Sequence, residues 1–198
     1  MQDIIIIAAM AENRIIGKNN VIPWSIKEDM VHFSKLTKGY PCIMGRKTWE
    51  SLPKKPLPGR LNIIVSGSAK EIKALSPDLY FSSKAKNSEL CPQIKPPDQN
   101  IKLCPSLPSA IDYCQNHKKI FICGGETIYR QALGLANKIE LTVIHRNYEG
   151  DTFFPEIDEN NWIISNEEKS SSVPNSDGNF DELTFLTYTR IKNFGDRA

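Results

Sequence analysis

The hydrophobic positions of this chain form short β-branched runs that are separated by segments with helical periodicity. The run over residues 4–9 (IIIIAA) is uninterrupted, as is typical of a strand buried on both faces of a parallel sheet. The other predicted strands are residues 42–44, 61–66, 120–123, 138–145, 162–167 and 183–190. The last three alternate more strongly and have no long helix between them, which predicts an antiparallel edge on an otherwise parallel sheet.

Helical segments lie between the early strands. Ser25 and Glu28 have capping-box spacing, which predicts a helix that starts after Ser25 and ends before Gly39. Its apolar face carries Met30, Phe33 and Leu36. Three further helices are predicted: a short one after Gly45, one over residues 107–116, and one after Gly124-Gly125. The order of elements predicts an α/β fold.

Two stretches interrupt this order. Residues 67–105 are rich in Ser, Lys and Pro and have no clear periodicity beyond residues 79–82, so we expect a surface insertion at about 68–104 within a single domain over residues 1–198. Residues 166–182 are predicted to form a loop within a long hairpin.

Composition and charge exclude several classes of protein. A net charge of +2 on 198 residues gives no basis for nucleic-acid binding. No apolar run reaches the ~20 residues of a membrane span. Cys42, Cys114 and Cys123 lie in apolar segments, and the odd cysteine count without a CxxC pair predicts a reducing, cytoplasmic location. Cys91 and Cys104 lie in one irregular stretch, so a disulfide between them is left open but not predicted.

Metal and nucleophile sites are not predicted. His32, His117 and His145 lack ligand spacing with Cys or carboxylates, and the chain has no GxSxG motif.

Asp29 lies on the apolar stripe of the first predicted helix. A carboxylate there is costly to bury unless something binds it, so it is a candidate binding group. Alternatively, Asp29 lies at the edge of the stripe, and its negative charge interacts favourably with the dipole at the helix N-terminus. Trp24 is likewise either a site residue or an ordinary core aromatic.

Two strand-to-helix turns are candidate phosphate sites. Residues 45–48 (GRKT) combine outward backbone N–H groups with Arg46, although a solvated basic turn fits as well. Residues 123–127 (CGGET) let the backbone approach a pyrophosphate, but they are not GxGxxG, and on their own they favour an ordinary helix entry. Thr142, on a late strand, is either a partner for a buried carboxylate or an ordinary strand residue.

Taken together and in order, these segments resemble dihydrofolate reductase from the first strand to the last, except at residues 68 to about 104. The residues that carry the resemblance are Ile7-Ala8-Ala9, Arg14-Ile15-Ile16-Gly17, Ile22-Pro23-Trp24, residues 29–33, residues 43–51, Leu57-Pro58-Gly59-Arg60, residues 62–66, Gly124-Gly125, Tyr129, residues 149–152 and Phe154-Pro155. The family implies an eight-stranded, mostly parallel mixed sheet with an antiparallel C-terminal edge strand, flanked by four helices, and a cis peptide at Gly124–Gly125.

The resemblance implies NADPH-dependent reduction of 7,8-dihydrofolate to 5,6,7,8-tetrahydrofolate in one-carbon metabolism, by a monomer that antifolates inhibit. Hydride passes to C6 and a proton to N5. The catalytic residues it implies are Trp24, Asp29 and Thr142. The substrate-binding residues it implies are Ile7, Ala8, Asp29, Met30, Phe33, Leu52, Leu57, Arg60, Cys123, Tyr129 and Thr142.

Roles for three of these residues also follow from the resemblance. Asp29 accepts hydrogen bonds from the amino group and N3 of the pteridine ring, and Thr142 holds the Asp29 carboxylate. Arg60 pairs in bidentate fashion with the α-carboxylate of the glutamate tail. A water is the expected proton donor to N5, and the loop over residues 17–24 is expected to close over the site.

The NADPH site that the resemblance implies spans the carboxyl ends of the strands. Its residues are Ala9, Ile16, Gly17, Asn20, Gly45, Arg46, Lys47, Thr48, Ser66, Gly67, Gly124, Gly125, Glu126, Thr127, Ile128, Tyr129 and Thr152. Arg46 favours NADP over NAD because the 2′-phosphate calls for a cation. Thr127 stands where many family members have a second basic residue, so either the preference for NADP is weaker or Lys47 compensates.

Three other functions are compatible with the sequence. A riboflavin-pathway pyrimidine reductase shares the fold, but Arg60 and the residue 23–29 pattern argue against it, because a ribosyl pyrimidine has no glutamate tail. A non-catalytic folate or NADPH carrier is opposed by the joint presence of Asp29, Arg60 and Arg46. An interaction protein that uses the insertion is the third alternative.

Overall fold

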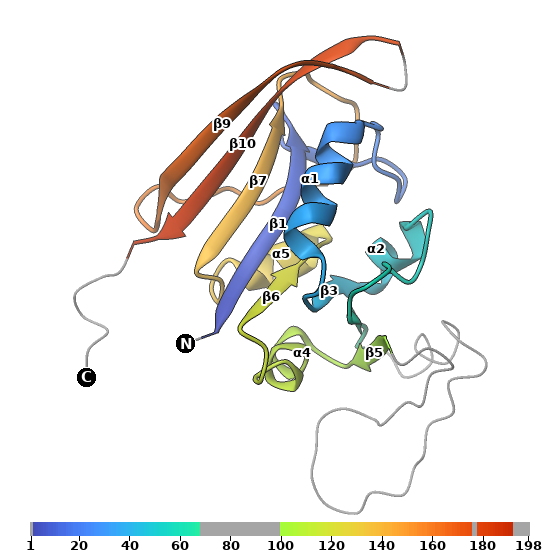
Figure 1. The fold of residues 1–198 in the computed structure, drawn as a ribbon, viewed down its shortest axis with the longest axis vertical. Coiled ribbons are helices and arrows are strands. Elements are labelled where there is room, and N and C mark those ends of the chain that lie inside the picture. The colour runs from blue at the N-terminus through green and yellow to red at the C-terminus, as the bar shows by residue number, and fades with distance from the viewer. Residues whose placement is uncertain (1, 68–99, 176–177, 192–198) are drawn as a thin grey trace, which may run out of the picture.

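The computed structural model describes residues 2–67, 100–175 and 178–191. Their core is an eight-stranded sheet of order β5-β4-β3-β6-β1-β7-β10-β9 (Figure 1). The strands are β1 (Asp3–Ala11), β3 (Cys42–Gly45), β4 (Asn62–Val65), β5 (Ile101–Cys104), β6 (Lys119–Ile122), β7 (Lys138–Ile144), β9 (Trp162–Pro174) and β10 (Phe180–Arg190). All neighbouring pairs are parallel except β7–β10 and β9–β10, so the predicted antiparallel C-terminal edge is confirmed.

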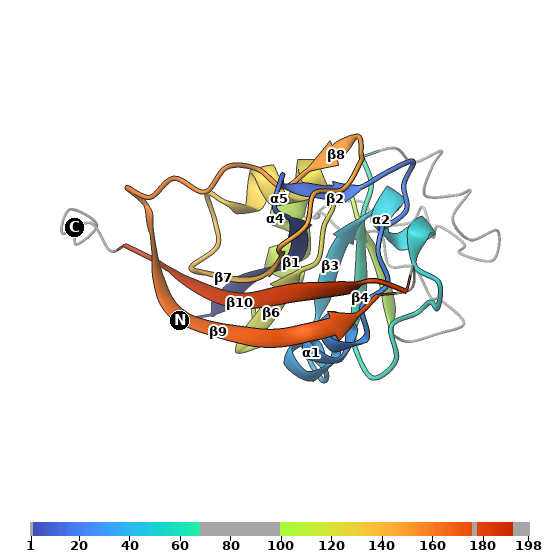
Figure 2. The same cartoon turned by 90° about the horizontal axis from the view of Figure 1, so that it is seen from above.

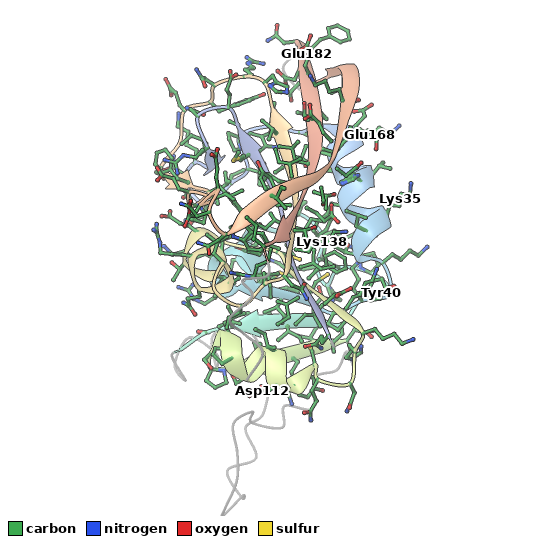
Figure 3. All side chains as sticks on the ribbon, turned by 90° about the vertical axis from the view of Figure 1, so that its left-hand side faces the viewer. Lys35, Tyr40, Asp112, Lys138, Glu168 and Glu182 are labelled. Atoms are coloured by element: carbon green, nitrogen blue, oxygen red, sulfur yellow. The ribbon has the colours of Figure 1, made fainter. Side chains whose placement is uncertain are left out.

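Helices cover both faces of the sheet. The helices of the described residues are α1 (Lys27–Thr37), α2 (Arg46–Ser51), α4 (Leu107–Tyr113) and α5 (Glu126–Ala132). Figure 2 shows α1 on one side of the sheet and α4 and α5 on the other. A small second sheet pairs β2 (Ile15–Gly17) with β8 (Thr152–Phe153). Figure 3 shows the length of the molecule, from Glu182 on the β9–β10 hairpin to Asp112 on α4.

The central strand β1 confirms the prediction of a strand buried on both faces. Ile5 and Ile7 pack into the cluster on the α1 side, whereas Ile6 and Ala8 pack into the cluster that α4 and α5 cover. Alternate residues of a strand point to opposite faces, so an uninterrupted apolar run serves both layers at once.

The start of α1 differs from the prediction. Ile26 is the N-cap residue and no side chain caps the helix, so the capping box at Ser25 and Glu28 is wrong. Instead, the Ser25 N–H donates to Asn175 Oδ1 at 3.2 Å, and Ile26 forms a bridge with Asn175. Pairing with the end of β9 therefore replaces the local cap. The predicted end before Gly39 is confirmed.

Two loop predictions are also wrong in part. β9 continues to Pro174 and pairs with β10 through residues 166–170, so most of the predicted 166–182 loop is strand. β5, which falls inside the predicted insertion, pairs in parallel with β4 and forms the far edge of the sheet. Residues 68–99, which include Cys91 and residues 79–82, lie outside the described residues. The predicted helix over residues 107–116 ends at Tyr113.

Asp181 is the centre of a buried polar network close to the start of α1. It is 3% exposed, accepts hydrogen bonds from Tyr148 Oη (3.1 Å) and Asn175 Nδ2 (2.6 Å), and lies 3.6 Å from Arg146 Nη1. The same Asn175 holds Ser25. The network thus ties the hairpin to the segment that leads into α1.

Replacing Asp181 by Ala is expected to lower the free energy of unfolding by about 2–4 kcal/mol, because buried donors lose their acceptor. Urea denaturation measures the change. Glu156→Ala, which removes an exposed pair with Arg14, is the control and should cost less than about 1 kcal/mol. Equal, small effects of the two variants would contradict a stabilising role for this network.

Within the described residues, no helix has the length and apolar character that crossing a membrane requires.

Candidate active site

The parallel strands β1, β3, β4 and β6 end at the same edge of the sheet. Gly45 is the last residue of β3 and Gly124 follows β6, and the Gly45 N–H donates to the Gly124 carbonyl at 2.7 Å. The peptide Gly124–Gly125 is cis, as the resemblance implied. A Cβ on Gly125 would lie 3.1 Å from Thr48 Oγ1, which is a tight contact, so glycine at this position favours the close approach of the entries of α2 and α5.

Asp29 on α1 and Thr142 on β7 form the polar end of the site. Burial raises the pKa of Asp29, and a hydrogen bond with the Thr142 hydroxyl partly offsets this effect. Thr142 itself is 3% exposed. The structure therefore brings together two predicted catalytic residues that are far apart in the sequence.

Tyr129 on α5 lies within electrostatic reach of this pair. Its hydroxyl donates to the Ile7 carbonyl at 2.9 Å. Burial, followed by the charges of Cys123 and Asp29, raises the pKa of Tyr129 well above its ordinary value, so the phenol stays neutral. Tyr129 is thus a buried hydrogen-bond donor that fixes the backbone of β1 beside the site.

Most of the predicted apolar contacts of the substrate share one cluster on the α1 side of the sheet. Ile7 is buried, while Phe33, Leu52, Leu57 and Cys123 are partly exposed against it. Two predicted residues lie elsewhere: the Ala8 side chain is in the cluster on the opposite face, and Met30 is 54% exposed.

Arg60 is buried beside this apolar cluster. It is 7% exposed, its Nε donates to the Pro58 carbonyl at 3.2 Å, and its Nη2 donates to Ser34 Oγ at 3.1 Å. Its guanidinium carbon lies 5.6 Å from the centre of the Phe33 ring. The cation is thus held in one orientation next to predicted substrate contacts.

Sequence reasoning missed two residues that orient Arg60. Ser34 accepts its hydrogen bond, and Asn62, which is fully buried, bonds to both the N–H and the carbonyl of Leu57 and to the Arg60 carbonyl, at 2.9, 3.1 and 2.9 Å. Asn62 therefore fixes the turn that carries Arg60. An asparagine inside the apolar run LNIIVS is the signal that could have identified it.

The loop over residues 17–24 is docked against residues 149–152. The Asn19 N–H donates to Asp151 Oδ2 at 3.0 Å, and Lys18 Nζ lies 2.7 Å from Glu149 Oε2. The bonds from Asn19 and from the Thr152 hydroxyl lower the pKa of Asp151, which therefore stays ionised. A Cβ on Gly150 would lie 2.5 Å from the Gly17 carbonyl oxygen, so this contact requires glycine.

Trp24 is 7% exposed and packs at 5.1 Å against the Tyr148 ring, in the core cluster below the loop. These contacts are those of a core aromatic that anchors the end of the loop.

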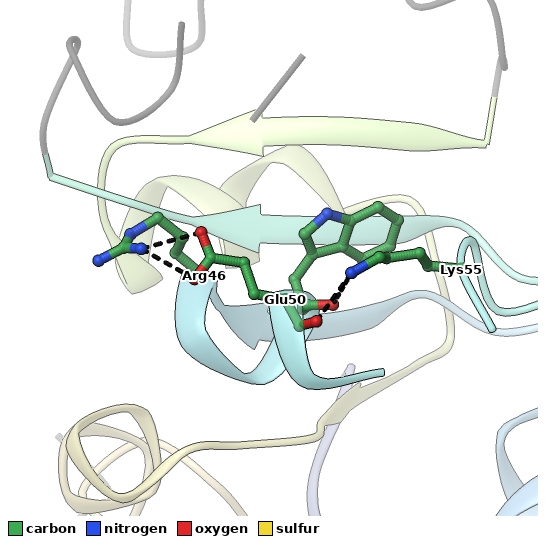
Figure 4. A network of polar contacts seen from close by, with 4 residues as sticks. Arg46, Glu50 and Lys55 are labelled. Atoms are coloured by element: carbon green, nitrogen blue, oxygen red, sulfur yellow. Dashed lines mark hydrogen bonds and ion pairs between the residues drawn. The ribbon is translucent and has the colours of Figure 1, made fainter. Parts of the chain in front are cut away.

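The cations of the predicted cofactor site lie on α2. Arg46 Nη1 donates to both carboxylate oxygens of Glu50 at 2.9 Å (Figure 4). Lys55 Nζ donates to the carbonyls of Trp49 and Glu50, so it caps the end of α2. Lys47 is close enough to Asp151 to lower the pKa of that carboxyl.

The turn after the glycine pair carries no cation next to the glycines. Thr127 is exposed, and Glu126 Oε1 pairs with Arg130 Nη2 at 2.7 Å, while its other oxygen accepts from the Phe153 N–H. The remaining predicted cofactor residues lie at or beyond the carboxyl ends of strands, or on the small sheet or α5: Ala9, Ile16, Gly17, Asn20, Ser66, Gly67, Ile128 and Thr152.

Comparisons with known proteins agree with this arrangement. A family model described as dihydrofolate reductase matches residues 3–93 and 90–190. The dihydrofolate reductase of Neisseria gonorrhoeae is 42% identical over 162 residues, which cover 82% of this chain and 85% of that protein. The dihydrofolate reductase of Bacillus subtilis is 35% identical over 170 residues, covering 85% and 86%.

Among solved structures, the fold is similar to that of the dihydrofolate reductase from Enterococcus faecalis complexed with NADP(H) and RAB-propyl. The TM-score is 0.74, and the alignment covers 96% of this chain and 97% of that chain, at 22% identity.

Proposed function

This chain belongs to the dihydrofolate reductase family, and we propose that it reduces 7,8-dihydrofolate to 5,6,7,8-tetrahydrofolate with NADPH, through the residues assembled around Asp29. The observation that carries the assignment of the site is the partly buried Asp29 carboxylate, bonded to Thr142, next to an apolar cluster that Arg60 borders. A flat heteroaromatic ring with a charged tail needs this combination of groups.

In this proposal the pteridine lies against Ile7 and Phe33. Asp29 accepts hydrogen bonds from the 2-amino group and N3, because an ionised carboxylate offers two acceptors in one plane. Arg60, already oriented by Ser34 and Pro58, binds the α-carboxylate of the glutamate tail. The pteridine end and the tail end of the substrate are thus fixed separately.

The residues at the strand ends fit a dinucleotide. A side chain on Gly125 would press against Thr48, so the glycine pair leaves the backbone open to close approach, and Arg46 and Lys47 supply cations nearby. NADPH, when bound, supplies the hydride that reduces C6.

The chain's own residues control the proton that N5 gains. Asp29 binds the far edge of the ring, so it is poorly placed to deliver the proton directly, and a water is the donor. The negative charge of Asp29 raises the proton affinity of the ring in a partly dehydrated site. The loop over residues 17–24, docked on Asp151 and Glu149, limits the access of bulk water.

The finer assignments belong to the same proposal. The protein acts as a monomer in the cytoplasm. The buried free thiols of Cys42, Cys104 and Cys114 are compatible with that location, because a reducing compartment preserves thiols. Antifolates compete for the Asp29 site. Residues 1–198 form one domain, in line with the direct pairing of β4 with β5 in the same sheet.

Isotope transfer tests the proposed reaction. With NADPH that carries deuterium on the transferred position of C4, the tetrahydrofolate product should carry one deuterium at C6, as NMR would detect. Unlabelled product would contradict direct hydride transfer, and labelled reduction of a ribosyl pyrimidine in place of dihydrofolate would reassign the substrate.

Replacing Thr142 by Val should lower kcat/KM for dihydrofolate about tenfold, since a hydrogen bond to a charged group contributes about 1.5–3 kcal/mol. The bond with Thr142 lowers the pKa of Asp29, so its loss should move the acid limb of the kcat/KM profile to higher pH. Thr142→Ser, which keeps the hydroxyl, is the control. An unshifted acid limb in Thr142→Val would separate Thr142 from the ionisation of Asp29.

A further inference from the structure

The carboxylate of Glu50 is paired with Arg46, the cation on which the proposed cofactor site depends. Arg46 and Glu50 are separated by one turn of α2, and Arg46 Nη1 reaches both carboxylate oxygens at 2.9 Å (Figure 4). The Arg46 side chain is 27% exposed and that of Glu50 is 46% exposed, so solvent reaches both partners. An incoming anion therefore meets a cation that already has a carboxylate bound.

The charges near Arg46 also limit how strongly this part of the site can bind an anion. Lys47 is within electrostatic reach of the ionised Asp151, and the turn after the glycine pair presents Thr127 and an acid, Glu126, that is paired with Arg130. Around the strand ends, then, Arg46 and Lys47 each have an acid close by. The strength of Arg46 as an anion site depends on how firmly Glu50 holds it.

We propose that Glu50 is a specificity-determining residue: its carboxylate competes with the 2′-phosphate of the dinucleotide for Arg46, and so sets how strongly the protein prefers NADPH to NADH. The inference rests on the proposed function, which places the 2′-phosphate at Arg46. The preference is then weaker than Arg46 alone would give.

The expected size follows from the exposure of the pair. Exposed ion pairs are weak, and breaking one corresponds to a factor of about two to five in an equilibrium constant. Glu50→Gln keeps the size of the side chain but removes the competing charge. It should tighten NADPH binding about two- to five-fold and leave NADH binding unchanged, and the gain should shrink at high salt because screening weakens both pairs.

The experiment measures dissociation constants of NADPH and NADH by isothermal titration calorimetry, with 2′,5′-ADP and 5′-ADP as probes of the phosphate alone. Glu156→Gln, which breaks the exposed pair with Arg14, is the control and should change none of the four constants. Selective weakening of NADPH binding by Glu50→Gln would overturn the proposal and make Glu50 a residue that positions Arg46. Equal changes for both dinucleotides would reduce its role to supporting α2.

Arg46→Gln separates this inference from the proposed function. If Arg46→Gln leaves the ratio of NADPH to NADH affinity unchanged, the 2′-phosphate does not bind at Arg46 and the assigned cofactor site is wrong. If Arg46→Gln removes the preference while Glu50→Gln has no effect, the site is right and the competition is refuted.

Discussion

Asp29→Asn is expected to lower the turnover of dihydrofolate at neutral pH by about two to three orders of magnitude. Replacement by an amide removes the negative charge that raises the proton affinity of the ring, and it replaces one of two acceptors by a donor. Activity should recover in part at low pH or with a substrate that is already protonated, because the charge is then no longer needed. Steady-state rates across pH measure both effects, and unchanged activity at neutral pH would refute the role of Asp29.

The same substitution should not weaken the fold. Burial raises the pKa of Asp29 above its ordinary value of 3.8, so the folded state favours the protonated carboxyl. The stability this group contributes is present below pH 3.8 and is lost as pH rises through the folded-state pKa. At neutral pH the ionised carboxylate is therefore a cost, which Asn avoids.

Urea denaturation of the ligand-free protein checks this sign. The difference in unfolding free energy between Asp29→Asn and the unchanged protein should shift in favour of the variant as pH rises from acid to neutral. A variant that becomes relatively less stable over that range would mean that Asp29 is retained for the fold, and its loss of activity would then say little about catalysis.

Arg60→Lys should raise the KM for dihydrofolate by about 10- to 100-fold with a smaller change in kcat. Lysine keeps the charge but cannot form the paired, planar hydrogen bonds to a carboxylate, and a hydrogen bond to a charged group contributes about 1.5–3 kcal/mol. It also loses the bonds to Ser34 and Pro58 that orient the guanidinium.

A substrate without the glutamate tail provides the control for Arg60. A dihydropterin lacks the carboxylate, so the unchanged protein and Arg60→Lys should reduce it with similar kcat/KM. A comparable loss on both substrates would show that Arg60 supports the pocket as a whole and does not bind the tail.

The sequence predicts the interior of this fold better than its edges. The uninterrupted apolar run over residues 4–9 predicts a central strand, and its side chains pack into the clusters on both faces of the sheet. Residues 166–170 form a strand because they pair with β10 at the sheet edge, where exposed polar side chains such as Glu167 and Glu168 are allowed. The pattern of hydrophobic residues does not predict such a strand, because most of its side chains are polar. β5 is missed because four residues beside a Ser-, Lys- and Pro-rich stretch give too short a pattern.

The sequence likewise predicts only part of the site. The sequence alone places Asp29 on a helical stripe, where a favourable interaction with the helix dipole is the preferred explanation. Its contact with Thr142 on β7 depends on the packing of α1 against the sheet, which no local spacing encodes. Ser34 and Asn62 were missed because their role is to orient Arg60, and only the packed turn before β4 shows it. Conversely, the predicted capping box at Ser25 is wrong because the Ser25 N–H donates to Asn175, which is distant in sequence.

Whether the protein is a dihydrofolate reductase is tested by following the consumption of NADPH by the purified protein in the presence of 7,8-dihydrofolate. One NADPH should be oxidised for each tetrahydrofolate formed, and an antifolate should abolish the rate, which should also be nearly abolished in Asp29→Asn. Tight binding of both ligands without any oxidation of NADPH would contradict this activity, and would make the protein a carrier built on the fold of an enzyme.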